Sequence, residues 1–289
     1  MPTPSLDTEI SIPLDDEQQV WMQFRLIPAG SFLMGARGQH VFEEPAHIVT
    51  IPFDYYLGKY PVTQRQFAVW TQLASVEHKN GYEGKPQNPA ENLNWFEACQ
   101  FCEWLQEKLQ LQNRSPKFYQ LAGFTASLPT EAQWEYACSA WHYDNRNDDP
   151  LRRDYTEYHT GDGPPALAQA GWFEGNNRGQ TQAVGQLTGN RHGLYDMHGN
   201  VWEWCSDQWD EMVYRHRING EIDPCVDNVV EDKDNAGRVR RGGSWNSHAT
   251  RCYVAFRYGN SPSYRGRING FRVGLFLVHS CQTEKQQNS

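Results

Sequence analysis

The order of the predicted strands and helices limits the folds open to this chain more than any other feature. Strand patterns come first, each short and either alternating or bounded by glycine, at 23–27, 30–35 and 46–53. Three helix patterns follow behind capping residues, at 64–73 after Thr63, at 95–111 after Asn94 and from Pro129-Thr130-Glu131 to about 140. Short strand-like pieces recur at 201–205, 238–241 and 271–278. Strands and helices do not alternate as in a doubly wound sheet, so we expect an α+β fold.

The remaining chain is largely irregular. Residues 141–170 and 207–237 are predicted as long loops. Residues 1–19 and 280–289 are polar and aperiodic, and we expect the first to be a disordered tail and the second a further tail. No linker or internal repeat divides the chain between them. With 38% hydrophobic and 13% aromatic residues, 20–279 is predicted to form a single domain with its own core.

Charge and cysteine usage restrict the partners and the compartment. A formal net charge of -9 argues against nucleic acid or an anionic membrane as the partner. No apolar run is long enough for a transmembrane helix, and the first residues lack the basic and apolar regions of a secretory signal. The 7 cysteines are odd in number and irregularly spaced, which favours reduced thiols. We therefore expect a cytoplasmic protein.

Residues 246–268 have an unusually restricted composition. Lys, Glu, Gln, Met and Trp are all missing, although these types make up roughly a fifth of the chain and about five would be expected. The stretch lies between two glycine-containing segments, 241–245 and 270–273. It contains Tyr, Phe and Arg among Ser, Gly and Asn, the mixture that is typical of binding surfaces. This pattern favours a binding site, in which side chains vary on a fixed backbone, over a catalytic one.

Two other motifs have alternative interpretations. Cys99 and Cys102 lie three residues apart within a predicted helix and have no second pair, so we expect them to pack in the core rather than to bind metal. In 189–204, Asp196, Glu203 and turn carbonyls are suited to a hard cation. The same segment is equally suited to a turn held by Asp and Asn hydrogen bonds. No histidine pair with metal-site spacing and no phosphate-binding glycine loop is present.

Six segments together resemble the sulfatase-modifying-factor, or formylglycine-generating-enzyme, family. They are 27–35 (IPAGSFLMG), 60–63 (YPVT), 94–98 (NWFEA), 128–137 (LPTEAQWEYA), 193–204 (GLYDMHGNVWEW) and 241–245 (RGGSW). The resemblance covers about residues 22–278 and implies one domain with the C-type-lectin-like fold of that family, rich in irregular loops. It also implies a structural Ca²⁺ held by Asp196, Glu203 and the carbonyls of Gly199 and Val201.

The resemblance further implies what the stretch 246–268 does. The two copper-binding cysteines of the formylglycine-generating enzymes fall on Ser247 and Cys252, and one thiolate cannot form a two-coordinate Cu(I) site. We therefore expect no copper and no oxidase activity. Residues 241–273 instead resemble the variable region of a diversity-generating retroelement target protein. There, template Asn codons become a residue set that lacks Lys, Glu, Gln, Met and Trp.

Within 241–273, two sets of positions follow from this resemblance. The scaffold set is expected to persist: 241–245, Ala249, Cys252, Ala255, Arg257, Pro262, Arg265 and 270–273. The diversified, ligand-binding set is Asn246, Ser247, His248, Thr250, Arg251, Tyr253, Phe256, Tyr258, Gly259, Asn260, Ser261, Ser263, Tyr264, Gly266, Arg267 and Ile268.

The resulting prediction is a non-enzymatic, monomeric protein that binds an unknown protein or other macromolecular ligand. A copper-dependent cysteine oxidase that uses Cys252 with another thiol is one alternative. A structural or regulatory family member with one fixed partner is the other.

Overall fold

The computed structural model describes residues 6–17, 19–36, 40–80, 84–112, 120–140, 156–217, 220–225 and 236–277. The predicted tail at 280–289 and the loop portions 141–155 and 226–235 lie outside the described residues. No helix in the described ranges has the length and apolar character needed to cross a bilayer.

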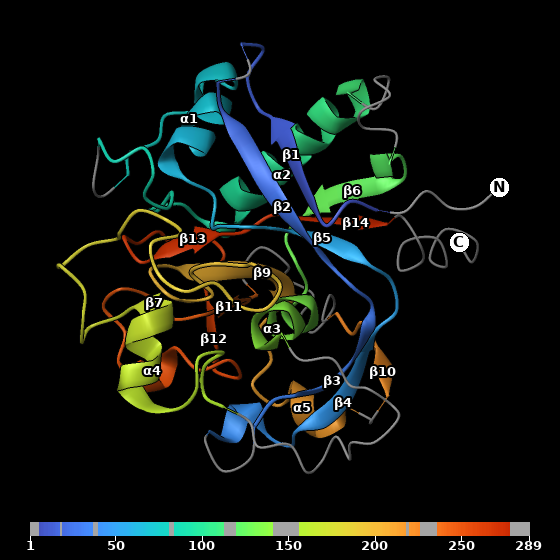
Figure 1. The fold of residues 1–289 in the computed structure, drawn as a ribbon, viewed down its shortest axis with the longest axis vertical. Coiled ribbons are helices and arrows are strands. Elements are labelled where there is room, and N and C mark those ends of the chain that lie inside the picture. The colour runs from blue at the N-terminus through green and yellow to red at the C-terminus, as the bar shows by residue number, and fades with distance from the viewer. Residues whose placement is uncertain are drawn as a thin grey trace.

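A five-stranded antiparallel sheet and two helices form one end of the molecule (Figure 1). The sheet order is β1 (Glu9–Pro13), β2 (Trp21–Ile27), β5 (Tyr55–Gly58), β14 (Gly274–Leu277) and β6 (Phe124–Ser127). Helices α1 (Gln64–Leu73) and α2 (Trp95–Gln112) pack beside it, and Phe67 and Phe101 join Phe24 and Leu275 in one core cluster. Thr63 and Asn94 make capping boxes with Gln66 and Glu97, as the sequence predicts.

The predicted disordered tail at 1–19 is wrong for its central part. Strand β1 pairs with β2 along its whole length, and Ile10 and Ile12 on its inner face are buried. Leu14 continues the same buried row. The alternation is genuine but only a few residues long, and without its partner strand it is not distinguishable from an irregular polar segment.

Smaller sheets surround α3 (Glu131–Ser139) at the other end (Figure 1). A three-stranded sheet has the order β10 (Glu221–Ile222), β4 (His47–Ile51), β3 (Gly30–Met34). A four-stranded sheet has the order β12 (Arg257–Asn260), β11 (Arg238–Arg241), β9 (Trp202–Gln208), β13 (Asn269–Phe271). A two-stranded sheet pairs β7 (Gly171–Trp172) with β8 (His198–Gly199). The remaining helices are α4 (Gly163–Ala170), α5 (Val213–His216) and the 3-10 turns Val41–Glu43 and Ala249–Arg251.

Two sequence predictions in this half need correction. The single strand expected at 271–278 is two strands, because the chain leaves the four-stranded sheet after β13 and joins the five-stranded sheet as β14. Helix α4 occupies part of the loop predicted at 141–170, with proline near its first turn. Both are tertiary effects, since a strand that changes sheets and a two-turn helix have no periodic signature.

Buried arginine–glutamate pairs tie α3 to the four-stranded sheet. Arg257 on β12 makes two hydrogen bonds to Glu131, Nε to Oε1 at 2.8 Å and Nη2 to Oε2 at 2.7 Å. Arg241 on β11 pairs with Glu135 and approaches Glu131. Burial alone would raise the pKa of Glu131, but the charges of Arg257 and Arg241 hold it below its usual value. The carboxylate of Glu131 is therefore ionised and shared by two strands.

A third buried pair lies behind the same sheet. Arg272 donates to both oxygens of Glu203, with Nη2 2.8 Å from Oε1 and Nε 3.0 Å from Oε2. Its guanidinium also donates to the carbonyls of Gly58 and Tyr195, each at 2.7 Å. Arg272 thus links β9 to β5 of the other sheet.

Substituting Glu131→Gln is expected to lower the free energy of unfolding by about 3–5 kcal/mol, because it leaves two buried guanidinium groups without their shared carboxylate. Urea denaturation followed by far-UV circular dichroism measures this. Glu9→Gln is the control, since Glu9 pairs with Arg25 and Lys59 at a partly exposed site and its loss should cost at most about 1 kcal/mol. Equal losses in the two variants would contradict the role given to the buried network.

Candidate ligand-binding face

Residues 246–268, named the variable segment after the prediction that its positions are diversified, cover the edge of the four-stranded sheet. It leaves β11 through a turn at 244–247, forms the 3-10 turn Ala249–Arg251, and returns as β12, the edge strand that pairs with β11. It then turns at 261–264 and enters β13. Strands β11 and β12 lie in the lower half of Figure 1, away from α1 and α2.

The backbone of this segment is held by residues outside it. Several of its carbonyls accept hydrogen bonds from such donors, among them Pro262 from the Trp95 N–H and Gly266 from the Asn92 N–H, both at 3.0 Å, Arg267 from the Trp245 indole at 3.0 Å, and Ile268 from the Trp202 N–H at 2.7 Å. None of these bonds involves a side chain of the variable segment. These bonds therefore do not depend on which side chains the segment carries at its exposed positions.

Burial separates the two predicted sets of positions. Among the predicted ligand-binding positions the exposed ones are Asn246, His248, Arg251, Tyr258, Ser261, Ser263, Tyr264 and Arg267, and the half-buried ones are Thr250, Tyr253, Gly259, Asn260, Gly266 and Ile268. Most of the predicted scaffold is buried, including 241–244, Ala249, Cys252, Arg257, Pro262 and 270–273. Arg265 is an exposed scaffold residue, and its guanidinium pairs with Glu97 in the cap of α2.

Three predicted ligand-binding positions do not fit a freely variable site. Ser247 is buried, and its hydroxyl accepts a hydrogen bond from the Ser244 N–H at 3.0 Å. Phe256 is buried against Trp202. A Cβ on Gly259 would collide with the ring of Trp209. Ser247 and Phe256 therefore support the face from beneath, and Gly259 leaves the room that the Trp209 ring occupies.

The turn before the segment requires its glycine. Gly243 has a φ of 73°, and a Cβ there would lie 2.5 Å from the Cys252 sulfur. Cys252 is fully buried, its carbonyl is hydrogen bonded to the His198 ring, and burial raises the pKa of its thiol to about 12. This thiol packs the turn and stays protonated at neutral pH.

Arg240 is a residue of this face that the sequence analysis did not select. It lies opposite Tyr258 in the β11–β12 pairing, on the same side of the sheet. Its guanidinium lies over the rings of Trp202, Tyr258 and Tyr264, at 5.0, 5.2 and 5.7 Å from their centroids. The available signal was the run of arginines without a carboxylate between 238 and 273.

The predicted calcium ligands do not fit a cation site. Both oxygens of Glu203 are bound by Arg272, and Oε2 also accepts from the Trp134 indole at 2.7 Å. A calcium ion at Glu203 would face the Arg272 charge. The Ca²⁺ expected from the resemblance is therefore not supported by these residues.

Hydrogen bonds hold the turn in place of a metal. Asp196 Oδ2 accepts from the Gly185 N–H at 2.7 Å and Oδ1 from the Asn200 amide at 3.1 Å. Burial raises the pKa of Asp196 to about 6. Gly199 sits with a φ of 74° against the Trp172 backbone, and Val201 is buried beside it. The alternative of an Asp- and Asn-bonded turn therefore describes the segment better.

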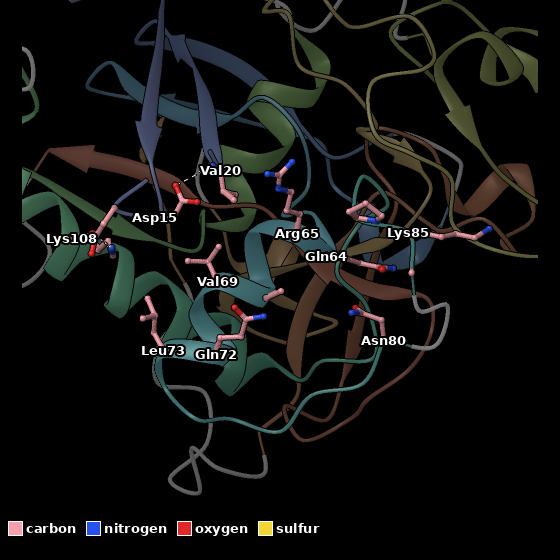
Figure 2. A pocket seen from close by; sticks show the side chains of 14 residues that line it. Asp15, Val20, Gln64, Arg65, Val69, Gln72, Leu73, Asn80, Lys85 and Lys108 are labelled. Carbon is pink, nitrogen blue, oxygen red and sulfur yellow. Dashed lines mark hydrogen bonds and ion pairs between the residues drawn. The ribbon is translucent and has the colours of Figure 1, made fainter. Parts of the chain in front are cut away.

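An open groove of about 680 Å³ lies at the opposite end of the molecule (Figure 2). It runs along α1, where Arg65, Val69 and Leu73 line it, and faces Asp15 and Lys108 (Figure 2). None of its lining residues belongs to the variable segment. The groove is thus separate from the candidate face.

Gly259→Ser is expected to lower the free energy of unfolding by about 1–3 kcal/mol, because the new side chain must displace the Trp209 ring. Gly266→Ser is the matched control. Its Cβ would meet only the tip of the exposed Tyr264 ring, so we expect a change within about 0.5 kcal/mol. Urea titrations of both variants measure these changes. Equal changes in the free energy of unfolding at the two positions would show that the Trp209 ring moves aside at no cost.

Chelation of divalent cations with EGTA is expected to leave the melting temperature unchanged, because Arg272 already balances the Glu203 charge. Differential scanning calorimetry with and without added CaCl₂ measures this. A fall of several degrees in the melting temperature on chelation, reversed by calcium, would show that the protein does bind calcium.

Comparisons with known proteins agree with this architecture. The "Treponema denticola variable protein 1" structure superposes with a TM-score of 0.72 at 23% identity, covering 93% of this chain and 99% of that one. At that identity the likeness concerns the fold, and it confirms the predicted α+β, C-type-lectin-like class.

Curated relatives are similar at the sequence level. "Chaperone protein LppX" of Paenibacillus barcinonensis is 27% identical over 76% of this chain and 79% of its own length. The formylglycine-generating enzyme of Bos taurus is 28% identical over 65% of this chain, but the match spans only 44% of the bovine protein. Residues 12–275 match the family described as "Sulfatase-modifying factor enzyme 1-like domain". The chain belongs to the sulfatase-modifying factor enzyme 1-like family.

Proposed function

We propose that this chain is a non-enzymatic binding protein whose variable segment contacts a protein ligand. We further propose that a diversity-generating retroelement diversifies the exposed positions of that segment. The observation that carries the proposal is that the contacts which fix the backbone of the segment are separate from the side chains that the segment exposes. Carbonyls of the segment are held by Asn92, Trp95, Trp202 and Trp245, while half of the predicted ligand-binding residues are exposed and most of the others are half-buried.

The chemistry of Cys252 supports a non-enzymatic role. A copper oxidase needs accessible thiolates, but this thiol is buried with a pKa near 12, and its counterpart position carries the hydroxyl of Ser247. Ser247 is itself engaged with Ser244. Neither side chain is presented to a substrate.

The character of the exposed side chains supports a protein ligand. Tyr258 and Tyr264 are 46% and 39% exposed, unusually high for large aromatic side chains, and Arg251 and Arg267 are exposed on the same segment. Tyrosine and arginine dominate the energetics of protein interfaces. The net charge of -9 disfavours a nucleic-acid or anionic membrane partner, and we propose that the protein binds as a monomer.

The cysteines bear on the compartment. The six cysteines within the described ranges are free thiols, and burial raises the pKa of several of them, including Cys102 and Cys205. Unpaired buried thiols fit a reducing environment. We propose a cytoplasmic location on this basis.

The DNA beside the gene tests diversification. We expect a near-copy of the segment encoding 246–268, with Asn codons at the exposed positions, and a reverse transcriptase gene nearby. Absence of both would overturn retroelement diversification. An invariant segment among close relatives would favour the structural or regulatory alternative with one fixed partner.

An oxidase assay tests the enzymatic alternative, which similarity to formylglycine-generating enzymes raises. Copper-loaded protein is incubated with a Cys-x-Pro-x-Arg peptide and oxygen, and peptide mass is followed by mass spectrometry. We expect the thiol mass to remain, because Cys252 is buried. Conversion of the cysteine would contradict the non-enzymatic proposal.

A further inference from the structure

Arg240 differs from the buried arginines around it. Arg241, Arg257 and Arg272 each pair with a glutamate. Arg240 is only 7% exposed, yet within the described part of the chain no carboxylate lies within ion-pair distance of it. It is a buried charge without a counter-charge, which is costly in a folded protein.

The hydrogen bonds of Arg240 are incomplete as well. Nη1 donates to the side-chain oxygen of Asn269 at 2.6 Å, whereas Nε is buried with no acceptor. The rings of Trp202, Tyr258 and Tyr264 offset part of the charge through cation–π attraction. Burial lowers the pKa of Arg240 to about 10, so the guanidinium still carries its charge at neutral pH.

The surroundings of Arg240 open toward the ligand side. The rings of Tyr258 and Tyr264 lie over its guanidinium and are themselves exposed, and exposed side chains change rotamer within nanoseconds. Between residues 238 and 273 the chain has no carboxylate that could compete for it. Arg240 precedes the variable segment, so it stays constant while the side chains above it change.

We propose that Arg240 is a fixed anchor for a carboxylate of the ligand, an Asp or Glu side chain of an acidic protein segment. This rests on the proposed function, because it places the ligand on the variable face. A planar guanidinium with an unused Nε–H can donate two parallel hydrogen bonds to the two oxygens of one carboxylate. The aromatic rim excludes water and strengthens that pairing. The variable side chains then select among acidic segments.

Asn269→Asp is the sharpest test, because it supplies an internal counter-charge. The Asn269 side-chain oxygen already contacts Arg240, and its Nδ2 is buried with no partner, so the substitution costs no hydrogen bond. We expect the variant to melt at the same or a higher temperature. With the melting temperature measured and unchanged or raised, loss of ligand binding in this variant cannot come from unfolding.

A fluorescein-labelled Gly-Ser-Glu-Ser-Gly peptide is the probe, because the net charge of -9 would repel a long polyanion, and fluorescence anisotropy reports its binding. We expect Asn269→Asp and Arg240→Met to weaken binding about tenfold or more relative to the wild-type protein. Arg65→Met is the matched control, since Arg65 is exposed on α1, far from β12 (Figure 1), and its loss should change affinity by less than about twofold. Three results would contradict the role of Arg240 as an anchor: unchanged binding by Asn269→Asp, no binding by the wild-type protein, or an equal loss of affinity in Arg65→Met.

A selection of random peptides displayed on phage separates this inference from the proposed function. We expect recovered peptides to be rich in Asp and Glu and to lose binding to Asn269→Asp. Peptides that need Tyr258 and Tyr264 but are not acidic would overturn the anchor and leave the binding face standing. If no recovered peptide depends on the variable segment, the proposed function fails as well. Selective binding of RNA in place of acidic peptides would overturn the anchor's assignment to a carboxylate.

Discussion

The buried pairing of Arg257 and Arg241 with Glu131 and Glu135 is the interaction on which the rest of this structure depends. It joins α3 to β11, which precedes the variable segment, and to β12 within it, and the Arg272–Glu203 pair extends the connection to the other sheet. Each charge is desolvated, so removing any partner leaves another uncompensated. The sheet edge therefore has one position relative to the body, which is what a surface with changeable side chains needs.

Within this short stretch of chain, the residues that stabilise the fold differ from those that are available to contact a ligand. Arg257 and Cys252 face inward and fill the core, whereas Tyr258 and Arg251 a residue away face solvent. Indole and backbone donors from outside the segment hold its carbonyls. We expect the face to tolerate new side chains at the exposed positions, where no other residue packs against them. It does not tolerate them at Gly259, where the ring of Trp209 occupies the space.

Much of the fold could be predicted where local signals are strong. Helices α1, α2 and α3 begin at the predicted caps, because an N-cap side chain and its partner three residues on lie close in sequence. Strands β2, β3 and β4 also lie where alternation predicts them. Strand β1 and the division of 271–278 into β13 and β14 were missed, because both depend on pairing with distant strands.

Motif order predicted the family and the α+β class, which the family match and the fold comparison confirm, and composition indicated the stretch that we propose as the face. Only the tertiary structure decided the chemistry of individual side chains. Glu203 is a partner of Arg272 instead of a metal ligand, and Arg240 lacks the carboxylate that its neighbours have. Residue types and their spacing show which chemical groups a site could contain. Which charges meet depends on strands distant in sequence coming within a few ångströms, since the energy of a buried pair falls steeply with separation and exposure.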